Sequence, residues 1–224
     1  MKTCSSWQRA RRDDQIEQRE AQILQAASDL FDQFRYDDIT LARIAKAAGF
    51  TRSNLYRYFP TREDVFLTLM SRDMDDWVDK VTQLMSHSDL DAESFVDHWM
   101  PVILSNPRMM RFYELLAGVF EQKASAERLL AFKQRLHEQM AVIIDQLLMQ
   151  NLFASSDGAS RFLVSHLAFV SGLYPKLHVS DHYRSLMESA GYEDSTDEYR
   201  LLMIEGVQAF YDRYRNDDRP SMAQ

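Results

Sequence analysis

Four polar side chains in one short segment could hydrogen-bond to the edges of nucleic-acid bases. They are Arg52, Ser53, Asn54 and Arg57. Arginine can pair with two acceptors of guanine, and asparagine can pair with adenine in a similar bidentate way. The segment lies within the 24 residues from Ile39 to Arg62, which hold five basic residues and no Asp or Glu. Because the whole chain has a formal net charge of −8, this stretch is suited to contact with a polyanion.

Two short helices joined by a tight turn are expected to position these side chains. Gly49 fits the left-handed position just past the end of a first helix. Thr51 is a suitable N-cap for a second helix over residues 52–59, in which Leu55 and Phe59 point inward. A helix held in this way, with polar side chains facing out, matches what the major groove of DNA accepts.

The sequence therefore predicts an interface with double-stranded DNA. The side chains expected to recognise bases are Arg52, Ser53, Asn54 and Arg57. Those expected mainly to hold phosphates are Thr40, Tyr56, Tyr58 and Arg62. Arg43 and Thr51 complete the predicted site, and Tyr58 has the alternative role of a core residue.

This stretch closely resembles the DNA-binding motif of the TetR (tetracycline repressor) family. The shared pattern is Ile39-Thr40, Ile44-Ala45, Ala48-Gly49, Leu55-Tyr56 and Tyr58-Phe59, followed by an acidic and hydrophobic run. The resemblance is strong over residues 16–69, and beyond that only size and helical character agree. Arg62 departs from the family, which usually has Lys there. Ala42 offers only apolar contact where some members have a side chain that reaches a base.

Composition, together with the apolar spacing and breaks along the chain, predicts an all-α fold of about nine helices. Hydrophobic residues make up 46% of the 224 residues, and only six Gly and five Pro interrupt them. We expect a helix-turn-helix domain over residues 1–62 and a helical effector-binding and dimerisation domain over residues 63–224. The first carries a net charge of +3 and the second −11. One long helix, from about residue 62 to residue 86, would join the two.

The termini and the cysteine content indicate a cytoplasmic protein. The single Cys4 excludes an internal disulfide framework and fits a reducing compartment. No apolar run approaches the roughly 18 residues that would span a membrane. Residues 1–12 are expected to be a disordered basic arm, which either reaches the DNA or remains a solvated tail.

An effector pocket is a hypothesis for the body, because the family resemblance implies a cavity there. Its predicted lining is aromatic and apolar with a few polar groups: Phe95, His98, Trp99, Phe112, Tyr113, Leu116, Leu136, His137, Met140, His166 and Phe169. For each of these residues an ordinary packed core is the alternative. A small apolar or aromatic effector would displace the far end of the long helix and release the operator.

Homodimerisation is expected through the last two long helices, which are apolar around more than one face. The predicted interface residues are Phe162, Leu163, Leu167, Met203, Val207, Phe210, Tyr211 and Tyr214. Residues 176–196 between the two helices are expected to form a polar loop.

These features together predict a ligand-responsive repressor that binds a palindromic operator. The alternative is a helical protein-interaction module whose basic end binds an acidic partner. An enzyme is disfavoured because no phosphate-binding loop, nucleophile elbow or zinc motif occurs. His178 and His182 lie four residues apart, but in a region expected to be a loop. We expect no cofactor and no bound metal.

Overall fold

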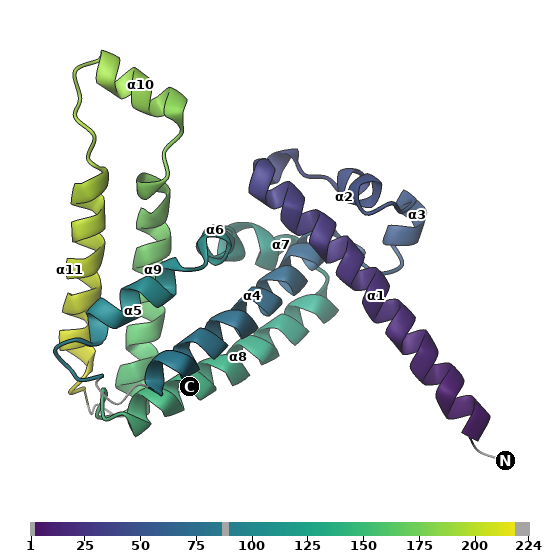
Figure 1. Cartoon of the computed structure of the whole chain (residues 1–224), viewed down its shortest axis with the longest axis horizontal. Helices are drawn as coiled ribbons and strands as arrows, with labels where there is room; N and C mark the ends of the chain where they lie inside the picture. The colour runs from purple at the N-terminus through teal and green to yellow at the C-terminus, as the bar shows by residue number, and fades with distance from the viewer. Residues whose placement is uncertain (1–2, 87–89, 218–224) are drawn as a thin grey trace. The chain divides into compact units, whose positions relative to one another are not determined.

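The computed structural model describes residues 3–86 and 90–217, and every regular element in these ranges is helical (Figure 1). The predicted all-α class is confirmed. The chain forms two compact units. The helix-turn-helix unit contains the chain up to Arg72 together with Ala117–Lys133. The body unit contains Asp73–Leu116 and the chain from Gln134 onward. This division groups residues 63–72 and 117–133 with the helix-turn-helix.

Several helices make up the helix-turn-helix unit. They are α1 (Thr3–Gln33), the 3₁₀ turn η1 (Tyr36–Asp38), α2 (Leu41–Ala47), α3 (Arg52–Leu55), the start of α4 (Arg62–Met85), most of the π-helical turn η2 (Leu116–Phe120), α7 (Glu121–Lys123) and the start of α8 (Ala126–Met149). The expected disorder of residues 1–12 is wrong for residues 3–12, which form the first turns of α1. Residues 1 and 2 lie outside the described ranges.

The core of the helix-turn-helix unit is aromatic where α1 and α4 meet the segment 117–133. Phe66 of α4 is fully buried, and its ring centroid lies 5.4 Å from that of Phe31 and 6.2 Å from that of Phe120. Leu55 and Phe59 are also fully buried, as the sequence predicts. Their burial holds α3 against the unit, so its opposite face is left to solvent.

The body unit contains five helices in addition to the later parts of α4 and α8. They are α5 (Phe95–Leu104), α6 (Pro107–Leu115), α9 (Ser156–Leu177), α10 (Asp181–Ser189) and α11 (Thr196–Tyr214). The expected loop over residues 176–196 is wrong in its middle, where α10 forms. Within the described residues, no helix is long and apolar enough to cross a membrane.

Aromatic rings fill the centre of the body unit. The ring centroid of Phe95 lies 5.3 Å from that of Trp99, 5.8 Å from that of Phe162 and 4.6 Å from that of Tyr211. Helices α9 and α11 run side by side (Figure 1). Gly206 allows this approach, because a Cβ there would overlap the ring of Phe169.

Most of the predicted dimer-interface residues on α9 and α11 are buried within the single chain. Six of the eight predicted residues are 0–1% exposed within the single chain: Phe162, Leu163, Leu167, Met203, Val207 and Tyr211. Phe210 and Tyr214 are half-buried against the same core. The apolar stripe that suggested a partner protein is therefore filled by the chain's own helices. Val164 of α9 and Leu202 of α11 are 68% and 46% exposed and lie on the opposite faces.

Candidate nucleic-acid interface

Threonine side chains cap both helices of the helix-turn-helix. Thr40 Oγ1 accepts the N–H of Arg43 at 3.2 Å at the start of α2. Thr51 Oγ1 accepts the N–H of Asn54 at 3.2 Å at the start of α3. The predicted caps are confirmed. Since each cap satisfies a donor that the helix itself leaves unpaired, the start of each helix is fixed.

A glycine closes the end of α2. Gly49 has φ +74°, a left-handed conformation that other residues adopt only with strain. The N–H of Phe50 then donates to the carbonyl of Ala45 at 2.8 Å, as in a Schellman motif. The ring of Phe50 packs edge-on against that of Tyr58, with centroids 6.2 Å apart. The turn that orients α3 is thus held by both backbone and ring contacts.

The recognition helix is shorter than the predicted span of residues 52–59. α3 ends at Leu55, and a hydrogen-bonded turn follows, in which the carbonyl of Leu55 accepts N–H groups from Tyr58 at 2.9 Å and Phe59 at 3.0 Å. Pro60 follows the turn. Leu55 and Phe59 are nevertheless buried in the core, and the residues around Leu55 are left exposed: Arg52, Ser53, Asn54, Tyr56 and Arg57.

The four predicted base-reading side chains are all exposed on this surface. Arg52 is oriented by a neighbour: its Nε and Nη2 donate to the hydroxyl of Tyr56 at 3.2 and 2.9 Å. No side-chain hydrogen bond joins Ser53, Asn54 or Arg57 to any other part of the described chain. Their donors and acceptors are therefore available to an outside partner, and the surface combines two guanidinium groups with an amide and two hydroxyls.

Arg62 is held inside the unit, although the sequence predicts it to contact phosphate. Its Nη1 donates to the carbonyls of Tyr36 at 3.0 Å and Ile39 at 2.7 Å. Its Nη2 lies 3.2 Å from a carboxylate oxygen of Glu63, and its guanidinium carbon lies 4.0 Å from the Tyr36 ring centroid. These contacts fix the start of α4 to the segment that precedes α2.

Tyr36 and Glu63 complete this network, and sequence reasoning missed both. The Tyr36 hydroxyl donates to Glu63 Oε1 at 2.7 Å in a buried position. Burial and the neighbouring carboxylate raise the pKa of Tyr36 well above its usual range. The hydroxyl therefore keeps its proton and remains a donor. The contact joins residues 27 positions apart, and no local spacing rule would indicate it.

Arg43 is also partly engaged within the unit. Its guanidinium carbon lies 3.6 Å from the ring centroid of Phe34, and its Nη1 donates to the carbonyl of Asp38 at 3.2 Å. The stacked guanidinium is half-buried at the edge of α2. Arg43 and Arg62 are thus arginines whose positions are set before any ligand arrives, in contrast to Arg57.

The start of α8 contributes to the same unit. Asp64 Oδ1 accepts from both the backbone N–H and the hydroxyl of Ser125, at 2.8 and 2.9 Å. Arg128 donates to Glu20 at 3.1 Å and to the backbone carbonyl of Tyr58 at 3.3 Å. A segment more than 60 residues beyond the helix-turn-helix therefore supports the end of the recognition surface.

The predicted pocket residues of the body are divided between core and surface. Phe95, Trp99, Phe112, Leu116 and His166 are buried; Tyr113, Leu136, Met140 and Phe169 are half-buried; His98 and His137 are exposed. The two exposed histidines therefore do not line an interior site in the described chain. The buried residues pack as the core alternative expects.

One polar pair lies among the buried aromatic rings. Trp99 Nε1 donates to His166 Nε2 at 3.1 Å, so Nδ1 carries the histidine proton and donates to the carbonyl of Phe162 at 2.9 Å. Burial lowers the pKa of His166 to about 4. His166 is consequently neutral over the physiological pH range and fixes two helices, α5 and α9, to each other.

Two family models match the chain in succession. The family described as "Bacterial regulatory proteins, tetR family" matches residues 23–69. The family described as "Tetracyclin repressor-like, C-terminal domain" matches residues 71–209. Both descriptions are of regulatory proteins and not of enzymes.

Curated relatives match over part of the chain. The chain is 38% identical over 56 residues to the HTH-type transcriptional regulator RutR of Escherichia coli, covering 25% of this chain and 26% of that protein. It is 43% identical over 54 residues to the HTH-type transcriptional regulator EthR of Mycobacterium tuberculosis, covering 24% and 25%. The alignments thus span about a quarter of the length of these relatives.

Solved structures share the fold over almost the whole chain. A protein of Mesorhizobium loti described as a TetR-family transcriptional regulator aligns with a TM-score of 0.53 and 18% identity, covering 89% of this chain and 98% of that one. FadR of Thermus thermophilus, a TetR-family transcriptional repressor in complex with lauroyl-CoA, aligns with a TM-score of 0.51 and 19% identity, covering 92% and 98%.

Proposed function

Because the chain belongs to the TetR family of bacterial regulatory proteins, we propose that it represses transcription by binding a palindromic operator as a homodimer. A small apolar or aromatic effector would release it, and its place of action would be the cytoplasm. The observation that carries the proposal is the exposed polar surface around α3, on which Ser53, Asn54 and Arg57 make no side-chain hydrogen bond within the described chain, in a capped helix-turn-helix. This surface fits the major groove.

Base recognition is expected to depend on Asn54 and Arg57. Replacing either with Ala should weaken binding to an operator by about 1–3 kcal/mol for each bidentate pair removed, with a smaller effect on random DNA. An operator can be selected from random duplexes with the purified protein, and affinities then measured by fluorescence anisotropy at fixed salt. Lys123→Ala, which removes an exposed cation outside the predicted DNA-binding residues, is the matched control. Equal losses on operator and random DNA would contradict a base-reading role.

Arg62 is expected to act mainly by positioning the helix-turn-helix. Arg62→Ala removes two carbonyl contacts and the ion pair with Glu63, and should lower the free energy of unfolding by about 2 kcal/mol. Operator affinity should fall with it. Denaturant unfolding and operator titration of the same variant distinguish a role in positioning the helix-turn-helix from a direct contact with phosphate. Lost affinity at unchanged stability would instead support the phosphate contact that the sequence predicts.

The proposed dimer face is the exposed side of α9 and α11. Val164, Ala168 and Gly172 are exposed at four-residue spacing on α9, and Leu202 and Ala209 are exposed on α11. Small residues with two large apolar side chains permit close packing of two helix pairs across a two-fold axis. A dimer of this kind would place its two recognition helices roughly 34–36 Å apart, one DNA turn.

Val164→Asp should convert the dimer into a monomer without unfolding it, because Val164 is 68% exposed in the single chain. Sedimentation velocity at micromolar concentration measures the change. Val142→Asp, at a position 44% exposed on α8, is the control and should remain dimeric. A wild-type protein that sediments as a monomer would exclude the dimer itself. A Val164→Asp dimer would exclude only this face.

The proposed effector enters the apolar body unit. Trp77 Nε1 and Gln139 Oε1 are buried there without a hydrogen-bond partner in the described chain, and such groups are costly unless something pairs with them. α4 carries Trp77 and runs on from Arg62 of the helix-turn-helix unit, so a ligand that moves this helix could act at its other end. A coupling of about 1–3 kcal/mol would change operator affinity roughly 5–150-fold. A ligand screen that measures operator release tests this.

A further inference from the structure

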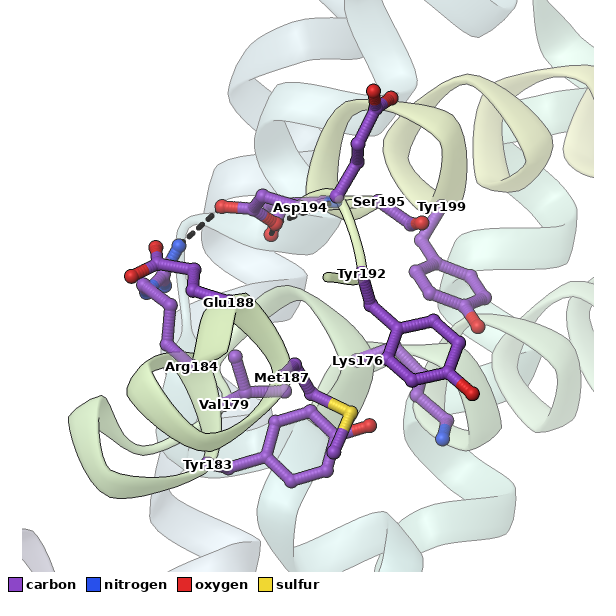
Figure 2. A pocket seen from close by; sticks show the side chains of 12 residues that line it. Lys176, Val179, Tyr183, Arg184, Met187, Glu188, Tyr192, Asp194, Ser195 and Tyr199 are labelled. Atoms are coloured by element: carbon purple, nitrogen blue, oxygen red, sulfur yellow. Dashed lines mark hydrogen bonds and ion pairs between the residues drawn. The ribbon is translucent and has the colours of Figure 1, made fainter. Parts of the chain in front are cut away.

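A hollow of about 170 Å³ lies in the body unit where α9 ends, α10 passes and α11 begins (Figure 2). Its lining includes Lys176, Tyr183, Arg184, Met187, Tyr192 and Tyr199. None of them belongs to the predicted effector site or to the recognition surface. The hollow is therefore separate from both of those predicted sites.

The walls of the hollow are held by local hydrogen bonds. Ser180 Oγ accepts the N–H of Tyr183 at 3.2 Å and caps α10. At its other end Gly191 has φ +82°, and the N–H of Tyr192 donates to the carbonyl of Met187 at 3.0 Å. This is the Schellman arrangement. Both ends of α10 are thus defined by the chain itself.

An ion pair fixes α10 to the start of α11. Arg184 pairs with Asp194, as the dashed line in Figure 2 shows. Asp194 Oδ1 also accepts the N–H of Thr196 at 2.9 Å. The charge of Arg184 is therefore satisfied within the wall. Of the two cations that line the hollow, this leaves Lys176 as the one without an ion-pair partner in the described chain.

The lining combines aromatic rings with unpaired hydrogen-bond donors. Tyr183, Tyr192 and Tyr199 contribute three rings, and Met187 adds a polarizable thioether beside them. Figure 2 shows the Lys176 amino group and the hydroxyls of Tyr192 and Tyr199 on one side of the hollow. Glu188 and Arg184 lie on the other side. Lys176 gives its side a positive charge that can pair with an anion, and the other charges of the lining are Arg184 and the carboxylates of Glu188, Glu193 and Asp194. The rings favour a flat apolar group.

The volume limits the size of an occupant. A cavity of about 150 Å³ in a protein interior can hold benzene, so 170 Å³ accommodates one aromatic ring with a small substituent. We propose that this hollow binds a single-ring aromatic carboxylate, with the ring between Tyr183, Met187 and Tyr192 and the carboxylate at Lys176. The Lys176 ammonium and the tyrosine hydroxyls supply charge-assisted hydrogen bonds to the carboxylate. This site shares no residue with the recognition surface or with the residues of the proposed dimer face.

Calorimetric titration of the full chain with benzoate tests the proposal. Wild type should bind with a dissociation constant of about 1 mM or tighter. Lys176→Met should weaken binding at least about tenfold, and benzamide, which has the same shape without the charge, should bind wild type correspondingly weakly. Lys123→Met, an exposed cation of the other unit, should bind benzoate as wild type does.

Two results would overturn the site: no heat of binding for wild type at about 10 mM benzoate, or equal affinity in wild type and Lys176→Met. Circular dichroism of each variant verifies that it is folded. Operator binding by Lys176→Met should be unchanged. Failure of wild type to bind any DNA would contradict the proposed function and leave the aromatic-acid site standing.

Discussion

Arg108→Met is expected to lower the free energy of unfolding by about 3–5 kcal/mol. Arg108, in the first turn of α6, forms a bidentate pair with Asp73 of α4: Nε to Oδ2 at 2.7 Å and Nη2 to Oδ1 at 2.5 Å. Asp73 is only 2% exposed. Methionine keeps most of the apolar stem of the arginine but leaves a carboxylate buried without its partner. Denaturant unfolding of the full chain measures the loss.

A second variant separates the pair from the packing around it. Asp73→Leu combined with Arg108→Met removes both charges, and replacement of a buried ion pair by apolar groups is often close to neutral. The double variant should therefore recover most of the stability lost by Arg108→Met. If the two variants are equally unstable, the loss comes from packing and the ion pair is not its cause.

Acid is expected to destabilise the body unit through His166. The pKa of this histidine falls from 6.5 to about 4 on folding because its ring is buried beside Trp99. Above pH 6.5 the folded and unfolded chains both hold a neutral ring. Between pH 6.5 and pH 4 the unfolded chain binds a proton that the folded chain excludes, so stability falls. The lowering of the pKa corresponds to about 3 kcal/mol by pH 4.

His166→Gln provides the comparison, since its longer side chain brings the amide oxygen to the position of Nε2, where it accepts from Trp99 Nε1 and does not titrate. The wild type should lose about 3 kcal/mol more than this variant between pH 6.5 and pH 4, because other titrating groups are common to both. An NMR titration of the His166 ring gives an independent measurement, in which its pKa in the folded chain should be about 4. If the free energy of unfolding depends on pH in the same way in the two proteins, protonation of His166 is not the cause of the loss in acid.

The helix-turn-helix could be predicted because its determinants are local. The caps at Thr40 and Thr51 and the left-handed Gly49 are each set by bonds to residues within five positions. Inward positions of Leu55 and Phe59 follow from helical spacing. α10 carried comparable signals in Ser180 and Gly191, but its polar composition suggested a loop.

Features that depend on distant residues could not be predicted. The contacts of Arg62 with Tyr36 and Ile39 join positions 26 and 23 residues apart, and His166 meets Trp99 across 67 residues. Periodicity also showed that α9 and α11 have apolar faces without showing what covers them. The buried Phe162 and Val207 are covered by the chain itself, and an exposed face remains for the proposed partner.

The helix-turn-helix unit is discontinuous in sequence, and this restricts how such a chain can be recombined. Phe120, Ser125 and Arg128 supply a ring, a hydrogen bond and an ion pair to the unit from beyond residue 116. A fragment that stops at Arg72 would expose Phe66 and leave the Asp64 carboxylate without Ser125. Chimeras that exchange DNA specificity between relatives must therefore transplant residues 117–133 along with the amino-terminal helices. A chimera made with a single junction would combine the amino-terminal helices of one protein with residues 117–133 of another, and the contacts between them would not be matched.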